Sequence, residues 1–306
     1  MTYHPALEAM LDTPEIRQIK KLEFPEQRKI FAELSKEQLK NIPKSNIKIK
    51  DIELKQDVTI RHYKPLKNIS DKAIFFIHGG GWCVGSIDTY DHICRYLCDN
   101  SDLNVFSLEY RVAPEAPFPA AVNDSLEAYD WLYTNAENFG VNNKNIFVMG
   151  DSAGGNLATI VCHERQDTMP KAQILVYPAV DMYSEYESQT KYGEYKYHLN
   201  LEWSAKFLHA YVEGSKQNRE ILKNPQISPL FYKNNKQPDT MIIAATHDVL
   251  IDGIYAYEKK LKEEGVMVET HYDPEMFHGF IGTVGLVPFQ NAVIALNKAI
   301  DFINKR

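Results

Sequence analysis

The sequence predicts an α/β protein with a mostly parallel sheet and helices on both of its faces. Short, almost wholly apolar segments such as AIFFI, NIFVM and QILVY alternate with helix-like segments over most of the chain. Parallel strands that are covered on both faces have such continuous apolar runs, because neither face meets water. The composition, 44% hydrophobic and 25% charged, is that of an ordinary globular protein and supplies the core that this architecture needs.

The order of the segments supports the same architecture. The first 45 residues are charged and helix-like, and the strand-like segments begin with VTIRHY at residue 58. The segments that follow are AIFFI, NVFSL, the helix-like AAVNDSLEAYDWLYTNA, NIFVM, the helix-like GNLATIVCHE, QILVY, TMIIAA, the helix-like GIYAYEKKLKEEG, VMVETHY and the helix-like PFQNAVIALNKAIDFINK. Ligands of open sheets bind beyond the carboxyl ends of the strands, so we look for chemistry directly after the apolar runs.

One region interrupts this alternation. Residues 181–225 contain no strand-like run but hold six of the 18 tyrosines of the chain. We interpret this region as a helical cap inserted into a main domain of residues 46–306, with the N-terminal helices of residues 1–45 completing the cap. The alternative interpretation is a packed surface excursion that does not touch a ligand.

Charge and cysteine content argue against several classes of protein. The chain has 34 basic and 41 acidic residues, a formal net charge of −7, and no basic block, which argues against a nucleic-acid partner. It has neither the apolar core of a signal peptide nor the run of about eighteen apolar residues that a membrane span requires. The four cysteines, Cys83, Cys94, Cys98 and Cys162, include no second close pair to complete a zinc site. We therefore expect a cytoplasmic protein with reduced thiols.

A glycine-rich turn follows the apolar run NIFVM. Residues 150–154, Gly-Asp-Ser-Ala-Gly, match the pattern G-x-S-x-G and stand between a predicted strand and a predicted helix. That context is typical of a nucleophile elbow, in which a strained turn exposes the serine, here Ser152. The first backbone N–H groups of the helix then point toward any anion that forms beside the serine. The alternative is a structural turn that happens to contain a serine.

A nucleophilic serine needs a base, and the base needs an acid to orient it. In this architecture the acid and then the histidine follow on loops after later strands. After TMIIAA the chain offers His247, Asp248 and Asp252, and VMVETHY together with the following DPEMFHGF offers His271, Asp273 and His278. We favour Asp248, because Asp252 is placed to cap the next helix. We favour His278 on its loop, because His271 falls within the strand alternation and His247 points away from the adjacent acid.

A second glycine cluster follows the strand-like AIFFI. Residues 78–82 read His-Gly-Gly-Gly-Trp, and the turn after this strand supplies part of the oxyanion hole in serine hydrolases of this architecture. Glycines suit that task because bare backbone can approach a substrate and adopt positive φ. The alternative is a flexible hairpin. We expect His78 to be a structural hydrogen-bonding residue, and we leave open whether Trp82 lines a pocket or only packs.

These motifs together resemble those of a known family. The segments HGGGW, EYRVAPEAPFPAAVNDSLEAYDWL, GDSAGGNLA, THDVLID, FHGF and NPQISPL occur in the order found in bacterial hormone-sensitive-lipase-type carboxylesterases of the α/β-hydrolase fold. The resemblance extends from about residue 70 to the C-terminus. It implies a mostly parallel, eight-stranded sheet with a helical cap, and it implies neither a metal nor an organic cofactor. By resemblance alone, a homodimer is plausible.

The resemblance also assigns residues to roles. It implies that Ser152 is the nucleophile, His278 the general base and Asp248 the acid that orients it. Two positions depart from the family pattern around the acid: Val249 replaces the usual proline, and Ala245 stands where glycine is common. These departures affect the expected shape of the loop and not the carboxylate.

The resemblance implies that the oxyanion hole is formed by the backbone N–H groups of Gly80, Gly81 and Ala153. We therefore expect a serine carboxylesterase that acts on small-molecule esters. The resemblance implies a preference for short acyl groups, which is common in the family. Two alternatives stay open. One is another serine hydrolase, such as a formamidase, lactonase or peptidase, and the other is a non-catalytic binding protein of the same fold. Receptors of the latter kind lack the histidine, so His278 argues against it.

Overall fold

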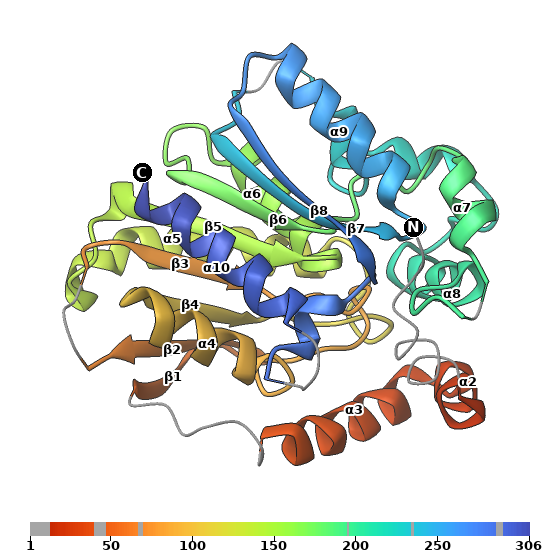
Figure 1. The fold of residues 1–306 in the computed structure, drawn as a ribbon, viewed down its shortest axis with the longest axis horizontal. Helices are drawn as coiled ribbons and strands as arrows, with labels where there is room; N and C mark the ends of the chain where they lie inside the picture. Colours follow the sequence, from red (N-terminus) through yellow and green to blue (C-terminus); the bar gives the residue numbers. More distant parts are fainter. Residues whose placement is uncertain (1–12, 40–46, 67–69, 195, 234–235, 286–289) are drawn as a thin grey trace.

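The computed structural model describes residues 13–39, 47–66, 70–194, 196–233, 236–285 and 290–306, and its strands form a single eight-stranded sheet with helices on both faces (Figure 1). The strands are β1 (Ile47–Lys55), β2 (Val58–Pro65), β3 (Ala73–Ile77), β4 (Asn104–Glu109), β5 (Ile146–Asp151), β6 (Ala172–Val176), β7 (Asp239–His247) and β8 (Val268–Phe277). Their order across the sheet is β1-β2-β4-β3-β5-β6-β7-β8. The predicted eight-stranded, mostly parallel sheet is confirmed.

The central strands pair in parallel, and the first two do not. β3 pairs in parallel with β4 and β5, and the parallel pairing continues through β6 and β7 to β8. All residues of β3, β5 and β6 are buried, which explains why these strands are mostly apolar. β1 and β2 pair with each other antiparallel, and β2 pairs antiparallel with β4. The carboxyl ends of β3 to β8 therefore lie at one edge of the sheet.

Strand β1 was not predicted, because its sequence IKIKDIELK alternates charged with apolar residues. It is an edge strand whose side chains are all partly or fully exposed, so it has no need of a continuous apolar run. Charged side chains on an edge strand also oppose pairing with a second molecule. A search for continuous apolar runs finds buried strands and misses an exposed edge strand such as β1.

The helices cover the sheet in two layers (Figure 1). α4 (Asp91–Ser101) and α10 (Asn291–Asn304) pack together on one face, and α5 (Ala120–Asn135) and α6 (Ala153–Glu164) pack together on the other. α9 (Ile251–Glu263) lies beside α6, where the Tyr257 hydroxyl is 3.3 Å from Nε2 of His163. Short 3-10 helices complete the chain: η1 (Ala136–Phe139), η2 (Asn143–Asn145), η3 (Arg219–Lys223), η4 (Pro229–Phe231) and η5 (Phe280–Thr283).

Two further groups of helices lie near the carboxyl edge of the sheet. Between β6 and β7 the chain forms α7 (Glu187–Tyr192) and α8 (Leu201–Tyr211), and the N-terminal region forms α2 (Pro14–Lys21) and α3 (Phe24–Leu39). Thr13 starts α2 by accepting a hydrogen bond from the Ile16 N–H, with proline at the first helical position. Residues 1–12 and 40–45 of the expected N-terminal helical region lie outside the described residues.

The N-terminal helices dock on α8 through side chains. Phe24 stacks on Phe207 with ring centroids 5.3 Å apart, and Phe31 packs against Trp203 at 6.5 Å. The buried side chain of Gln27 accepts a hydrogen bond from Trp203 Nε1 at 3.3 Å. We call α2, α3, α7 and α8 together the cap helices.

Candidate active site

Ser152 occupies a strained turn between β5 and α6. Its backbone has φ 53° and ψ −118°, a conformation that residues with a side chain rarely adopt. The turn requires close contact between helix and sheet: a Cβ on Gly154 would lie 2.0 Å from the carbonyl oxygen of Ile77. The Ser152 N–H donates to the carbonyl of Val176 at 2.9 Å, which fixes the turn against β6. The strand, turn and helix that the glycine pattern predicts are all present.

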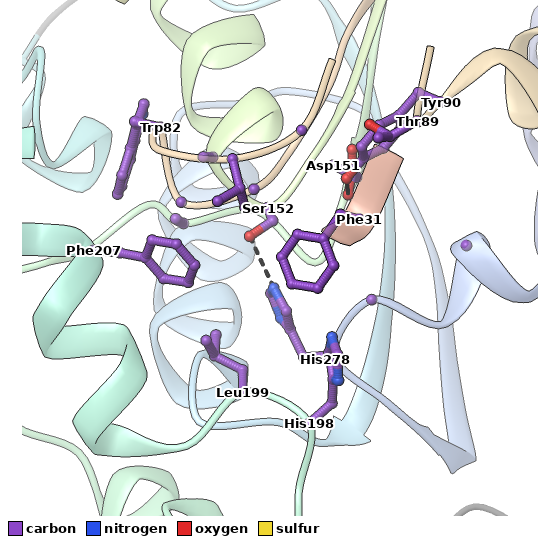
Figure 2. A pocket seen from close by; sticks show the side chains of 18 of the residues that line it. Phe31, Trp82, Thr89, Tyr90, Asp151, Ser152, His198, Leu199, Phe207 and His278 are labelled. Atoms are coloured by element: carbon purple, nitrogen blue, oxygen red, sulfur yellow. Dashed lines mark hydrogen bonds between the residues drawn. The ribbon is translucent and has the colours of Figure 1, made fainter. Parts of the chain in front are cut away.

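The structure brings Ser152, His278 and Asp248 together. Nε2 of His278 is 2.8 Å from the Ser152 hydroxyl (Figure 2). Nδ1 of His278 is 2.6 Å from Oδ2 of Asp248. An ionised carboxylate only accepts hydrogen bonds, so Nδ1 carries the proton and Nε2 presents its lone pair to the hydroxyl. The second oxygen of Asp248 accepts the Leu250 N–H at 2.9 Å, and its side chain is fully buried. This is the geometry of a nucleophile, a base and an orienting acid.

The competing candidates lie elsewhere. His271 belongs to β8 and pairs with Ile243 in the sheet, and His247 ends β7 with its ring parallel to that of Tyr197 at 6.3 Å. Asp252 is not the N-cap of α9, as its position in the sequence suggested, because Leu250 holds that place. Asp252 instead lies in the first turn of α9 and accepts the N–H of Ser188, which ties α9 to α7.

Gly80, Gly81 and Ala153 line the same pocket as Ser152. The turn after β3 places Gly80 at φ 107° and Gly81 at φ 58°, both in the region that favours glycine. A Cβ on Gly81 would lie 2.3 Å from the ring of Phe207, so this position also has no room for a side chain. Among the described residues, no acceptor is found for the N–H groups of Gly80, Gly81 or Ala153. These three groups are therefore free to bind an anion beside Ser152.

Asp151 supports the turn after β3 and was not anticipated from the sequence. Its carboxylate accepts the Gly79 N–H at 2.8 Å and the Tyr90 hydroxyl at 2.9 Å. Burial raises the pKa of Asp151 to about 6, although both hydrogen bonds favour the ionised form. The available signal was its place immediately before Ser152, since a buried acid at the end of a strand requires partners.

His78 has the structural role expected of it. Its Nδ1 is 2.8 Å from the Gly79 carbonyl, and its ring stacks on Tyr110 with centroids 4.3 Å apart. Burial lowers the pKa of His78 to about 4, so the ring is neutral near pH 7. The Tyr110 hydroxyl donates to the His78 carbonyl at 3.0 Å and holds the start of the glycine turn.

A mostly apolar pocket of about 350 Å³ opens beside Ser152. Its walls come from the turn after β3, from α3 and from the region around α8, with Phe31, Trp82, Leu199 and Phe207 among the lining side chains (Figure 2). Trp82 both lines the pocket and packs, because its ring is parallel to that of Tyr211 at 4.5 Å. Concave apolar sites with a few polar groups are typical of small-molecule binding.

The described residues contain no group of histidine, cysteine and acidic side chains placed to hold a metal ion. All four cysteines are buried and unpaired, and burial raises the thiol pKa values of Cys83, Cys94, Cys98 and Cys162. Within the ranges of the chain described above, no helix has the length and apolar character to cross a membrane.

Comparison with known proteins agrees with this geometry. A family model described as alpha/beta hydrolase fold matches residues 74–282. Two relatives, each 33% identical, are the carboxylic ester hydrolase LipN of Mycobacterium tuberculosis and the ethyl acetate hydrolase of Pseudomonas putida. The alignments cover 74% and 72% of this chain, and 61% and 71% of the relatives. The chain thus spans about six tenths of the length of the mycobacterial relative.

Solved structures extend the similarity over the whole chain. The Francisella virulence factor BioJ is 66% identical over the full length of both chains, with a TM-score of 0.96. An esterase of Pyrobaculum calidifontis is 29% identical over 99% of both chains, with a TM-score of 0.90. Because the family model covers more than half of the chain, the protein belongs to the alpha/beta hydrolase family, in the hormone-sensitive-lipase-like branch to which its motifs pointed.

Proposed function

We propose that this protein is a serine carboxylesterase that uses Ser152 as nucleophile, His278 as general base and Asp248 as the orienting acid. The observation that supports this most directly is the unbroken series of contacts from the hydroxyl through the imidazole to the buried carboxylate, 2.8 and 2.6 Å long. Relatives named as ester hydrolases support the reaction class.

The first half of the reaction forms an acyl-enzyme. The Ser152 oxygen attacks the ester carbonyl while Nε2 of His278 accepts the hydroxyl proton. The imidazolium that results is stabilised by Asp248, which keeps Nδ1 as the donor. When the tetrahedral intermediate collapses, His278 returns the proton to the alcohol oxygen and the alcohol leaves.

The negative charge of the intermediate needs donors that are already in place. We assign this task to the N–H groups of Gly80, Gly81 and Ala153, because these residues line the pocket beside Ser152 and their N–H groups have no acceptor among the described residues. Water then enters, His278 acts as base again, and the acid is released from Ser152 by the same sequence of steps.

The pocket favours small esters with short acyl groups. Its volume of about 350 Å³ lies near the lower end of the range of about 300–1,000 Å³ found for ligand sites. Phe31 from α3 and Phe207 from α8 both line it, so we propose that the N-terminal helices and the 181–225 region together form a cap over the site. This assignment favours the cap over the alternative of a packed surface excursion.

Replacing Ser152 with alanine tests the proposal. The variant should keep the thermal unfolding midpoint of the parent and lose its activity on p-nitrophenyl acetate by several orders of magnitude. Labelling of the parent at Ser152 by a fluorophosphonate probe would exclude a non-catalytic binding protein. A panel of esters, amides and lactones separates an esterase from another serine hydrolase. Unchanged ester hydrolysis by Ser152→Ala would refute the assignment.

A further inference from the structure

His198 is a polar side chain in the wall of the pocket that the proposed mechanism does not use. It precedes α8 and lies close to His278 in the pocket (Figure 2). A Cβ built on Gly279 would be 3.2 Å from Cδ2 of His198 and 3.6 Å from its Nε2. The imidazole therefore lies over the backbone of the loop that follows His278.

The surroundings of the His198 ring are aromatic. It meets Trp203 edge-on at 5.8 Å and Phe277 edge-on at 5.6 Å between ring centroids. Its main chain is fixed from the N-terminal region, because Nζ of Lys20 donates to the His198 carbonyl at 2.7 Å. The ring is thus held in place by packing and by a backbone contact, and not by hydrogen bonds of its own.

Neither nitrogen of His198 has a hydrogen-bond partner among the described residues. Nδ1 is enclosed by protein and unpartnered, so Nε2 is the nitrogen that remains available to the pocket. Buried polar groups are normally paired, and an unpaired one in a site is explained most simply by a ligand or water that it binds. An enclosed N–H is rarer than an enclosed lone pair, which favours the tautomer with the proton on Nε2.

The ring is uncharged in the working range of pH. Burial lowers the pKa of His198 to about 3, and the positive charges of Lys20 and of protonated His278 lower it further in the same direction. A neutral N–H donor recognises an acceptor oxygen of a neutral group, such as an ether or a carbonyl. It offers no charge with which to bind a carboxylate.

We propose that His198 is a specificity-determining residue that donates a hydrogen bond from Nε2 to an acceptor oxygen in the alcohol part of the ester. The inference rests on the proposed function. His278 must return its proton to the leaving alcohol, so the alcohol lies on the His278 side of Ser152. His198 covers Gly279 on that same loop, which places it against the alcohol and away from the acyl group.

Two acetates of equal length test this assignment. 2-Methoxyethyl acetate and n-butyl acetate differ only by an ether oxygen in place of one methylene group of the alcohol. The parent should have the higher kcat/KM for the ether, and His198→Phe should reduce this ratio about tenfold, the usual effect of one neutral hydrogen bond. The change should appear mainly in KM, since the bond forms in the ground state as well.

A second pair of esters distinguishes the two sides of the substrate. Methyl 3-methoxypropanoate and methyl pentanoate place the same replacement in the acyl part, and His198→Phe should leave their ratio unchanged. The inference is overturned if the ratio for the acetates stays within twofold of the parent value, or if only the acyl pair responds.

Two further variants separate hydrogen bonding from packing. His198→Gln retains an N–H donor and should keep part of the preference for the ether, whereas His198→Leu should lose it; equal behaviour of the two refutes the inference even if His198→Phe fails to fold. Fluorophosphonate labelling of Ser152 in each variant reports the intact catalytic residues. A parent protein that neither labels nor hydrolyses any of the four esters would contradict the proposed function and not this inference alone.

Discussion

The surroundings of Ser152 and the cap helices are built by different kinds of contact. Around Ser152, backbone approaches backbone so closely that a Cβ on Gly154 would overlap the Ile77 carbonyl. The cap helices meet through side chains, such as the Phe24 and Phe207 rings at 5.3 Å. In the first region a glycine has no substitute, because any side chain would occupy the space of the main chain. In the second, several apolar side chains of similar volume would fill the same space.

This difference suggests that the two regions have different tolerance to change. The surroundings of Ser152 should be sensitive to changes of a single atom, since one misplaced proton or methyl group disrupts the contacts there. The cap helices should respond to the loss of whole side-chain contacts.

The largest expected effect is that of Asp248→Asn. The amide would donate to Nδ1 of His278 and so force the proton onto Nε2, which could then no longer accept the serine proton. We expect kcat to fall about ten-thousandfold, with an unfolding midpoint close to that of the parent. Steady-state kinetics on p-nitrophenyl acetate and thermal denaturation measure the two quantities. A loss of less than tenfold would mean that Asp248 does not orient the base.

The next effect is on stability. Gly154→Ala places a methyl group against the main-chain carbonyls of Ile77, the last residue of β3, and of His78, the residue after it. We expect the free energy of unfolding to fall by about 3 kcal/mol or more. Urea denaturation measures it.

Gly253→Ala in α9 is the matched control. Its Cβ would meet only side-chain atoms, Tyr186 Cε2 at 3.5 Å and Asp181 Cβ at 3.6 Å, which are ordinary contacts. We expect no loss, and a gain of up to about 1 kcal/mol from the lower entropy of the unfolded chain. Equal destabilisation by the two substitutions would show that helix position, and not the close approach of the main chains, decides the outcome.

The difference between backbone contacts around Ser152 and side-chain contacts in the cap helices also explains how much of the site could be predicted from the sequence. Ser152, Asp248 and His278 each follow a strand whose apolar run is visible in the sequence, and parallel strands end at one edge of a sheet. The glycines are visible because the close approach permits no other residue. What the sequence did not reveal is the partner of Asp151, because Tyr90 lies on a loop whose path depends on the packing of the whole turn.

The 181–225 region was predictable only as an interruption of the strand and helix alternation. The absence of a strand-like run in 181–225 indicated an insertion, but neither the bounds of α7 and α8 nor the side chains that enter the pocket follow from the sequence. His198 illustrates the limit, since nothing in the segment KYHLNL shows that its ring would lie beside His278. Side-chain contacts between distant segments follow from tertiary packing, which local patterns do not encode.

The smallest expected effect concerns the attachment of the N-terminal helices. Nε2 of Gln27 donates to the carbonyls of Leu22 at 2.9 Å and Lys20 at 3.3 Å, and its oxygen accepts the N–H of Trp203. Gln27→Leu keeps most of the volume and removes these three hydrogen bonds, although Lys206 Nζ still donates to the Leu22 carbonyl. We expect a local cost of about 1–3 kcal/mol, seen as faster hydrogen exchange and faster proteolysis within residues 14–39.

Gln18→Leu is the control for this change, because Gln18 is exposed on α2 and should leave the exchange rates unaltered. Trp203 and Phe31 line the pocket, so loosening of α3 by Gln27→Leu should raise KM several-fold while kcat on a small acetate changes little. We expect that separation because the contacts that join Ser152, His278 and Asp248 involve no residue of the cap helices. If Gln27→Leu lowered kcat as strongly as it raised KM, the cap helices would also help to position Ser152, His278 and Asp248, and the expected separation would be wrong.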